Sequence, residues 1–431
     1  MNKLEKIVYD IVKNNPKIKL GLRNLYQSFY DLLPDGNNWT FSPIVVKEGY
    51  FFGFHDVTPF SANEEFVLSN KLEIGENPLR MPKAGDLLTV GYWNQDFSVF
   101  NEVAQTHAWN YHKGCRLQWV GNDPESFIYN DYLDGKMCAN IYSIADSTNR
   151  RVEYPIDTVC HNGKYATSFS YERLNRCMPG YGYIFHDDIS FLDDKTPDNT
   201  GLFLVDVEHN TTEMIVSLAQ LYSIEHDSTM DEATHYITHT EFSPDDSRIS
   251  FLHRWTNLED TRKRFTRLVT CNLDGSDMKI SETTGMVSHY VWDQKHGILA
   301  YSRVHDVDGH YVFSDYTIHK PYRVAKKINS DGHQSYIPNT DFFVTDTYPD
   351  KHRHAKLFVC GVKTDKMLKI ADLKSFKKYQ SILPEKHWAC DLHPRVSPKG
   401  TYVCFDSVHT GKRAVCFMPL DSAVKKISLS N

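Results

Sequence analysis

Residues 393–406 read His393-Pro394-Arg395-Val396-Ser397-Pro398-Lys399-Gly400-Thr401-Tyr402-Val403-Cys404-Phe405-Asp406. This stretch predicts a short strand, a tight turn and a second strand. Pro398 fixes φ for the turn, and Gly400 tolerates the positive φ that closes it. The residues after the turn alternate as is typical of a strand packed on both faces. The fold follows from how often this unit recurs.

Units with the same organisation recur along the chain. Further copies begin at His55, His239, His289 and His333, and weaker copies begin at Arg116 and Asp157. Their spacing of roughly 40 to 80 residues is typical of four-stranded propeller blades that carry insertions. The sequence therefore predicts an all-β, seven-bladed β-propeller over residues 41–431, preceded by a short helical segment over residues 1–40.

The two ends of the chain should decide how the propeller closes. Residues 414–418 and 424–429 are both expected to be outer strands of the last blade. A strand from the N-terminal region is expected to complete one blade, and the sequence does not indicate which.

Composition narrows the class of protein. The chain has 431 residues, of which 41% are hydrophobic and 13% aromatic, and this is ample for a packed core. Its net charge of −7 argues against a nucleic-acid-binding protein. The cysteines form no CxxC pairs, and neither a secretory signal nor an apolar run of membrane-spanning length is present. These features predict free thiols and a cytoplasmic protein.

Residues 1–33 differ in character from the rest. Apolar residues fall at helical spacing on one side, with lysines on the other, and Pro16 separates them from a second helical stretch over about residues 20–33. Two interpretations stay open. The segment either packs as a helical pair against the main domain or rests, as a basic amphipathic segment, on an anionic membrane surface at the inner membrane face.

The residues that open the seven units should meet at one mouth of the propeller, because the first strand of each blade lines the central channel. One inner-strand histidine is usually structural. Burying five together is costly unless a metal, an anion or a catalytic step uses them. The expected ring is His55, Arg116, Asp157, His239, His289, His333 and His393.

One part of this ring predicts a divalent metal site. His289, His333 and His393 come from three successive blades, and Asp391 lies two residues before His393. Imidazole and carboxylate ligands suit Mn²⁺ or Zn²⁺. We therefore expect His289, His333, Asp391 and His393 to hold one ion.

The other part predicts acid–base chemistry on an acidic oligosaccharide. Histidine, tyrosine and arginine occur there without a nucleophilic Ser or Cys pattern, which favours proton abstraction beside a carboxylate. β-Elimination from a uronic acid needs a cation, a base and an acid. The expected catalytic residues are His239, Arg116, Arg173, Tyr181 and His55. The expected substrate-binding residues are His107, His112, Gln118, Tyr183 and Arg254.

These motifs resemble those of a known family. The ring histidines, the His-Thr-Glu-Phe-Ser-Pro-Asp unit at His239, the Ser-His-Tyr-Val-Trp unit at His289 and the Asp-Leu-His-Pro unit at Asp391 are similar to oligogalacturonate lyases and related seven-bladed ulvan lyases. The resemblance spans roughly residues 50–420. It implies a base at His239 and manganese ligands at His289 and His393.

The sequence departs from this family at two positions. Asp391 stands where the family has a histidine ligand, and Trp388 stands where it has a glutamine. Arg173-Leu174 with Pro179-Gly180-Tyr181-Gly182-Tyr183 resembles the insertion of ulvan-lyase-like proteins. That resemblance implies Arg173 against the substrate carboxylate and a tyrosine as the acid.

Three functions stay open from the sequence. The first is a lyase that cleaves uronate-containing oligosaccharides by β-elimination. The second is a non-lyase propeller of surface-polysaccharide biosynthesis, either transferase-associated or glycan-binding; the basic N-terminal segment and the Gly-Tyr-Phe-Phe-Gly-Phe-His stretch at residues 49–55 favour it, although no nucleotide-sugar motif is visible. The third is a protein-interaction propeller, which lacks Trp-Asp repeat endings and leaves the polar ring unexplained.

Overall fold

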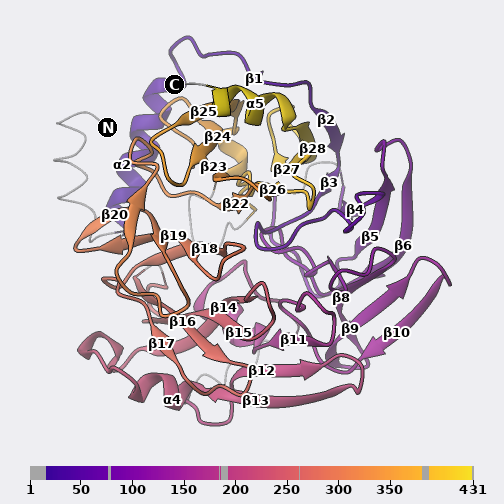
Figure 1. Ribbon diagram of the computed structural model, residues 1–431, viewed down its shortest axis with the longest axis vertical. Helices are drawn as coiled ribbons and strands as arrows, with labels where there is room; N and C mark the ends of the chain where they lie inside the picture. Colours follow the sequence, from indigo (N-terminus) through magenta and orange to yellow (C-terminus); the bar gives the residue numbers. More distant parts are fainter. Residues whose placement is uncertain are drawn as a thin grey trace.

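The chain folds into seven antiparallel sheets arranged around a central axis, and Figure 1 looks along that axis. A computed structural model describes residues 16–75, 79–183, 185, 193–261, 263–380 and 388–429. The predicted seven-bladed β-propeller is confirmed. The first predicted N-terminal helix, over residues 1–15, lies outside the described residues.

The first three blades follow one another in chain order, each running from the axis outward. Blade one contains β3 (Tyr50–Phe51), β4 (Phe66–Leu72), β5 (Leu88–Asn94) and β6 (Phe100–Thr106). Blade two contains β7 (Gln118–Trp119), β8 (Ser126–Leu133), β9 (Lys136–Ser143) and β10 (Thr148–Val152). Blade three contains β11 (Tyr165–Ser168), β12 (Gly201–Asp206) and β13 (Thr211–Ser217).

Blades four to seven repeat the same order. Blade four contains β14 (Thr234–Phe242), β15 (Arg248–Thr256), β16 (Arg264–Asn272) and β17 (Lys279–Ile280). Blade five contains β18 (Val287–Trp292), β19 (Ile298–Val304), β20 (Val307–Phe313) and β21 (Tyr322–Val324). Blade six contains β22 (Gln334–Tyr336), β23 (Phe342–Asp346), β24 (His354–Gly361) and β25 (Met367–Lys374), and blade seven contains β26 (Arg395–Val396), β27 (Tyr402–Ser407) and β28 (Ala414–Pro419).

Two N-terminal strands close the propeller. β2 (Val45–Glu48) pairs with β28 and is the outer strand of blade seven, and β1 (Trp39–Thr40) adds a fifth strand to blade six beside β25. The expected closing strand is therefore β2. The predicted outer strand over residues 424–429 is wrong, because α5 (Asp421–Leu429) is a helix that buries Ala423 and Ile427, four residues apart on one face.

Apolar side chains fill the space between neighbouring blades. Blades six and seven, for example, share a cluster in which Val344, Leu357, Val403 and Phe405 are fully buried. All nine cysteines are buried free thiols, as predicted. This packing holds the inner strands rigidly around the axis, where the candidate site lies.

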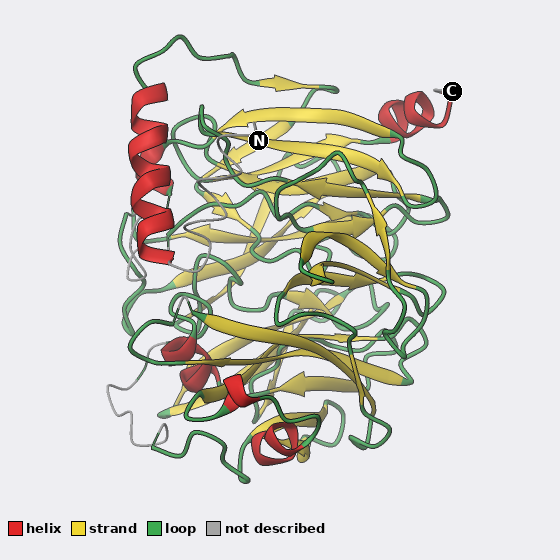
Figure 2. Ribbon diagram, turned by 90° about the vertical axis from the view of Figure 1, so that its left-hand side faces the viewer, coloured by secondary structure: helices red, strands yellow, loops and turns green. Residues whose placement is uncertain are grey.

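The helices lie outside the sheets. They are α2 (Pro16–Tyr30), α3 (Tyr171–Cys177), α4 (Leu218–Ser223) and α5, with short 3₁₀ turns η2 (Ser228–Met230) and η3 (Lys377–Tyr379). Figure 2 shows α2 lying along one face of the propeller. Pro16 begins this helix rather than only interrupting the pattern, as suits a residue whose missing N–H costs nothing in a first turn. Within the described part of the chain, none of the helices has the length and apolarity needed to cross a bilayer.

Candidate functional site

The five predicted histidines meet at the axis, around the ring of Phe54. The ring centroid of Phe54 lies 4.6 Å from that of His55 and 4.7 Å from that of His239. His393 follows at 5.0 Å, and His289 and His333 at 5.8 and 6.0 Å. All five imidazoles are buried. The repeat alignment therefore places these residues correctly.

Backbone geometry aims several of these side chains inward. Arg116, His239 and His393 have positive φ of 56°, 55° and 45°, which is strained for residues other than glycine. Arg116 and His393 lie just before an inner strand, and His239 lies at a register shift within β14. Such strain persists only where surrounding packing enforces it, and it concentrates at functional sites.

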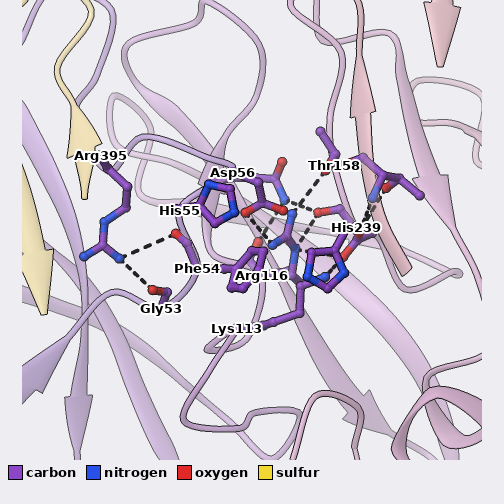
Figure 3. Close-up of polar contacts among 12 residues, drawn as sticks. Gly53, Phe54, His55, Asp56, Lys113, Arg116, Thr158, His239 and Arg395 are labelled. Carbon is purple, nitrogen blue, oxygen red and sulfur yellow. Dashed lines mark hydrogen bonds and ion pairs between the residues drawn. The ribbon is translucent and has the colours of Figure 1, made fainter. Parts of the chain in front are cut away.

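Blade seven fixes the segment that carries Phe54. The Asp406 carboxylate accepts hydrogen bonds from the backbone N–H groups of Phe52 and Gly53, at 3.0 and 3.1 Å. Arg395 donates to the Gly53 carbonyl at 2.7 Å (Figure 3). Gly53 has φ of 126°, and a Cβ there would lie 2.9 Å from the Lys113 backbone. Only glycine lets Phe54 reach the centre of the ring.

Burial sets the protonation of the histidines. It lowers the pKa well below the usual value for His55, His239, His289 and His393. His333 differs: burial alone would lower its pKa, but the Asp346 carboxylate, 3.0 Å away, raises it. Among the described residues, the buried Nε2 atoms of His55, His239 and His393 have no hydrogen-bond partner. The ring thus combines neutral imidazoles that can accept a proton or ligate a metal with one that favours its charged form.

The two other ring residues belong to an internal charge network. Asp157 lies 2.8 Å from Lys113 and 3.1 Å from Arg116, and Arg116 also pairs with Asp56 at 2.9 Å (Figure 3). Burial alone would raise the pKa of Asp157, but Arg116 and Lys113 hold it well below its usual value. All four side chains are buried. Arg116 is therefore committed to a structural network and does not face a substrate.

Several other predicted site residues also have internal partners. The Arg173 Nε donates to the His235 carbonyl at 2.7 Å, and its Nη2 donates to the Asp194 and Lys195 carbonyls. Gln118 donates to the Asp157 carbonyl at 3.0 Å. Tyr183 packs on Tyr171 in a hydrophobic cluster, and His107 lies in a separate small pocket. Gln118 therefore reaches the ring at the backbone of Arg116 and Asp157, whereas Arg173, Tyr183 and His107 contact residues outside the ring.

A pocket of about 220 Å³ opens at the mouth beside the ring. Its lining includes Arg23, His112, Tyr181, Arg264, Tyr348 and Asp391. Of the residues that the structure describes, none of the five ring histidines lines it. His112 and Asp391 connect the two, because both line the pocket and both have a ligand atom within 4.8 Å of one on His393.

Tyr181 reaches this pocket from the predicted insertion. Ser170 caps α3 by accepting from the Arg173 N–H, and the chain then returns so closely that a Cβ on Gly182 would lie 2.0 Å from the Tyr171 carbonyl. The Tyr181 ring stacks on His112 at 4.5 Å and lies 6.3 Å from His239. Burial, with Asp391 nearby, raises the pKa of Tyr181, so the phenol keeps its proton at neutral pH.

His112, Asp391 and His393 form a candidate metal centre. Their ligand atoms all lie within 4.8 Å of one another, and His393 offers a buried Nε2 without a partner. Asn110 positions His112 by accepting from its backbone N–H at 3.0 Å. Two imidazoles and a carboxylate fit a divalent ion. Of the predicted ligands, Asp391 and His393 belong to this cluster, whereas His289 and His333 lie beside Asp331 and Asp346 instead.

Two arginines lie near the pocket: Arg264 lines it, and Arg254 contacts the lining residue Met178. Arg254 is buried, and it donates to the Ser288 carbonyl at 3.0 Å and contacts Met178. Its Nε has no partner, and no described carboxylate lies within ion-pairing distance. Burial lowers the pKa of Arg254 to about 10, and the nearby Arg264 charge adds to this effect. Arg264 lines the pocket itself, and within the described part of the chain it forms no ion pair.

Sequence reasoning missed three parts of this site. Phe54 precedes His55 in the first unit, but it was not distinguished from core aromatics. Arg23 and Arg264 lie outside the repeated motif, in a helix and at an outer-strand start. His112 was predicted only as a substrate-binding residue and not as a metal ligand. These residues are brought together only in three dimensions, and no motif in the sequence marks them as a group.

Comparisons with known proteins identify the fold. No protein-family model matches the sequence, and no curated protein sequence matches it significantly. The structure is similar to an oligogalacturonate lyase in complex with manganese, with a TM-score of 0.64 and 13% identity over 91% of this chain and 97% of that one. It is also similar to oligogalacturonate lyase from Vibrio parahaemolyticus, with a TM-score of 0.57 and 12% identity over 90% of this chain and 100% of that one. The chain therefore has the fold of these lyases over nearly its whole length.

Proposed function

We propose that this propeller is a lyase that cleaves uronate-containing oligosaccharides by β-elimination in the pocket lined by His112, Tyr181, Arg264 and Asp391. The observation that carries the proposal is the pair of arginines at the pocket that also contains the His–Asp cluster. Arg254 and Arg264 supply buried and pocket-lining positive charge without an internal carboxylate. A carboxylate of the substrate would complete this arrangement.

Charge neutralisation is the first requirement of the reaction. A guanidinium against the C6 carboxylate makes the C5 proton more acidic and stabilises the charge that develops when the proton leaves. Arg264 takes this role, in place of the predicted Arg116 and Arg173, and Arg254 behind Met178 strengthens the field. A Mn²⁺ or Zn²⁺ ion held by His112, Asp391 and His393 would supply further positive charge at the same end of the pocket.

Proton transfer is the second requirement. A metal-bound imidazole does not accept a proton, so we assign His112 to the metal and the proton to Tyr181 and His239. The neutral His239 removes the C5 proton at its free Nε2, and the Tyr181 hydroxyl, which keeps its proton at neutral pH, gives that proton to the departing O4. The free Nε2 of His239, with its pKa lowered by burial, supports this assignment.

The test is product formation from defined substrates. Purified protein is incubated with Mn²⁺ and galacturonate, alginate or ulvan oligosaccharides, and the ultraviolet absorbance of the unsaturated product is followed. We expect turnover of at least one uronate oligomer. Tyr181→Phe and Arg264→Gln should each lower kcat/KM by about 100-fold, as is usual when a proton-transfer or charge-stabilising group is removed. Arg151→Gln, on the surface of blade two, is the matched control. Absence of product from every oligomer would refute the lyase, and binding without cleavage would favour the glycan-binding alternative.

A further inference from the structure

Helix α2 contributes a wall to the pocket, although it belongs to no blade. Arg23 and Gln27, one turn apart on the same face, both line the pocket together with Tyr348 and Asp391. The opposite face of α2 exposes Leu22, Leu25 and Phe29 to solvent. The helix therefore turns its polar face, and not its apolar face, toward the propeller.

Specific polar contacts fix the position of α2. Gln27 is 2% exposed, and its Nε2 donates to the Asp350 carbonyl at 2.9 Å. Arg353 donates to Gln27 at 3.1 Å and makes a two-point contact with the Asp31 carboxylate at 2.7 and 3.0 Å. These contacts involve blade six and do not involve Arg23. The helix is thus held in place independently of the guanidinium that it directs to the pocket.

Arg23 reaches the pocket without forming an ion pair of its own with the described residues. No ion pair of Arg23 with a carboxylate occurs among the described residues, although the Asp391 carboxylate lies close enough to interact with its charge. Arg23 is exposed where it lines the pocket, so its guanidinium is accessible to a ligand there. A cation kept at a pocket wall without an ion-pair partner is available to an anionic ligand.

We propose that Arg23 is a specificity residue that binds a second carboxylate of the substrate, on the sugar next to the one that reacts. The proposal rests on the proposed function, and it adds that the pocket recognises an oligouronate by two charged groups. Arg264 holds the reacting uronate, and Arg23 holds its neighbour. Helix α2 then bounds the pocket and favours short acidic oligosaccharides over neutral ones.

The experiment measures binding, so that it does not depend on turnover. Isothermal titration at low salt compares trigalacturonate with its carboxyl-reduced, neutral counterpart, in a Tyr181→Phe background that leaves the ligand uncleaved. Arg23→Gln should raise the Kd for trigalacturonate about tenfold, which corresponds to about 1.4 kcal/mol, and should leave the neutral sugar unaffected. Arg23→Lys should restore most of the affinity, and the salt dependence of binding should be smaller in Arg23→Gln. Arg151→Gln is the control for loss of a surface guanidinium.

The outcomes separate the two proposals. Unchanged trigalacturonate affinity in Arg23→Gln, or an equal loss for the acidic and neutral sugars, would overturn the role of Arg23 and leave the lyase standing. Failure of the parent protein to bind trigalacturonate would overturn the role of Arg23, whereas the lyase is overturned only if no uronate oligomer gives product. The thermal midpoint of Arg23→Gln should match the parent, because α2 is held by Gln27 and Asp31, and a lowered midpoint that Arg23→Lys does not restore would also count against the proposal.

Discussion

Two groups of charges lie near the histidine ring, and they differ in whether carboxylates balance their cations. Around Asp157, the cations Lys113 and Arg116 are matched by two buried carboxylates at 2.8 to 3.1 Å. Beside the pocket, Arg254 and Arg264 form no ion pair with a carboxylate of the described residues. The sequence made both groups look alike, as arginines near a polar axis. The ion-pair partners seen in the structure distinguish a network that stabilises the fold from cations that are available to bind an anion.

Removing a charge from the ion-paired network around Asp157 should have the largest effect on the free energy of unfolding. Asp157→Asn leaves Lys113 and Arg116 buried with one carboxylate fewer, which should lower the free energy of unfolding by about 3–5 kcal/mol. Chemical denaturation followed by tryptophan fluorescence measures this change. Asp134→Asn is the matched control, since its exposed pair with Arg151 at 2.9 Å should contribute less than about 1 kcal/mol. Equal effects of the two variants would contradict the distinction drawn here.

Removing a charge from the unpaired group should not lower the free energy of unfolding, in contrast to Asp157→Asn. Arg254→Met removes a desolvated charge that lacks an ion-pair partner, so the free energy of unfolding should stay level or rise. The same change should lower kcat/KM by about 100-fold, or about 2.7 kcal/mol, because the positive field at the pocket falls. Denaturation and product absorbance on one preparation give both numbers. A loss of stability comparable to that of Asp157→Asn would place Arg254 among the structural cations.

How much of the site could be predicted from the sequence differs between these regions. The hairpin repeat correctly placed five histidines around one axis, because equivalent positions in successive blades are equivalent in space. It could not distinguish Arg116 from Arg254, since the decisive fact is which carboxylate comes within hydrogen-bond distance from another blade. The pocket position of Arg23 and the place of His112 in the candidate metal cluster were missed for a related reason: Arg23 lies in a helix and His112 in a loop between blades, outside any repeat. The blade-seven closure by β2 also required long-range pairing that local patterns do not encode.

Measurements of metal binding can distinguish the cluster that contains His112 from the ligand set, including His289, that was expected from the sequence. His112→Ala removes a member of the structural cluster and should weaken Mn²⁺ binding by at least about 10–100-fold. His289→Ala, a ligand expected from the sequence, should leave the Kd for Mn²⁺ nearly unchanged, because its Nδ1 faces Asp331 at 3.4 Å. Titration of Mn²⁺ into metal-free protein measures both values. The reverse order of effects would favour the set built on His289 and His333.

The smallest expected effect per residue is on the free energy of unfolding, and it comes from buried histidines remote from the pocket. Their protonation depends on pH and not on a ligand. Burial lowers the pKa of His235 and His310 to about 4, and lowers that of His253 further from its usual value. Because these folded pKa values lie below the unfolded value of about 6.5, the unfolded chain binds more protons between pH 6.5 and 4. Acidification through this window should therefore destabilise the fold, by up to about 1.4 kcal/mol per pH unit for each histidine. Urea denaturation at pH 7, 6 and 5 should show this slope, and His310→Phe should reduce it. A flat profile from pH 7 to 5 would mean that these imidazoles are not held neutral by burial, and the same would then be doubtful for His239 in the ring.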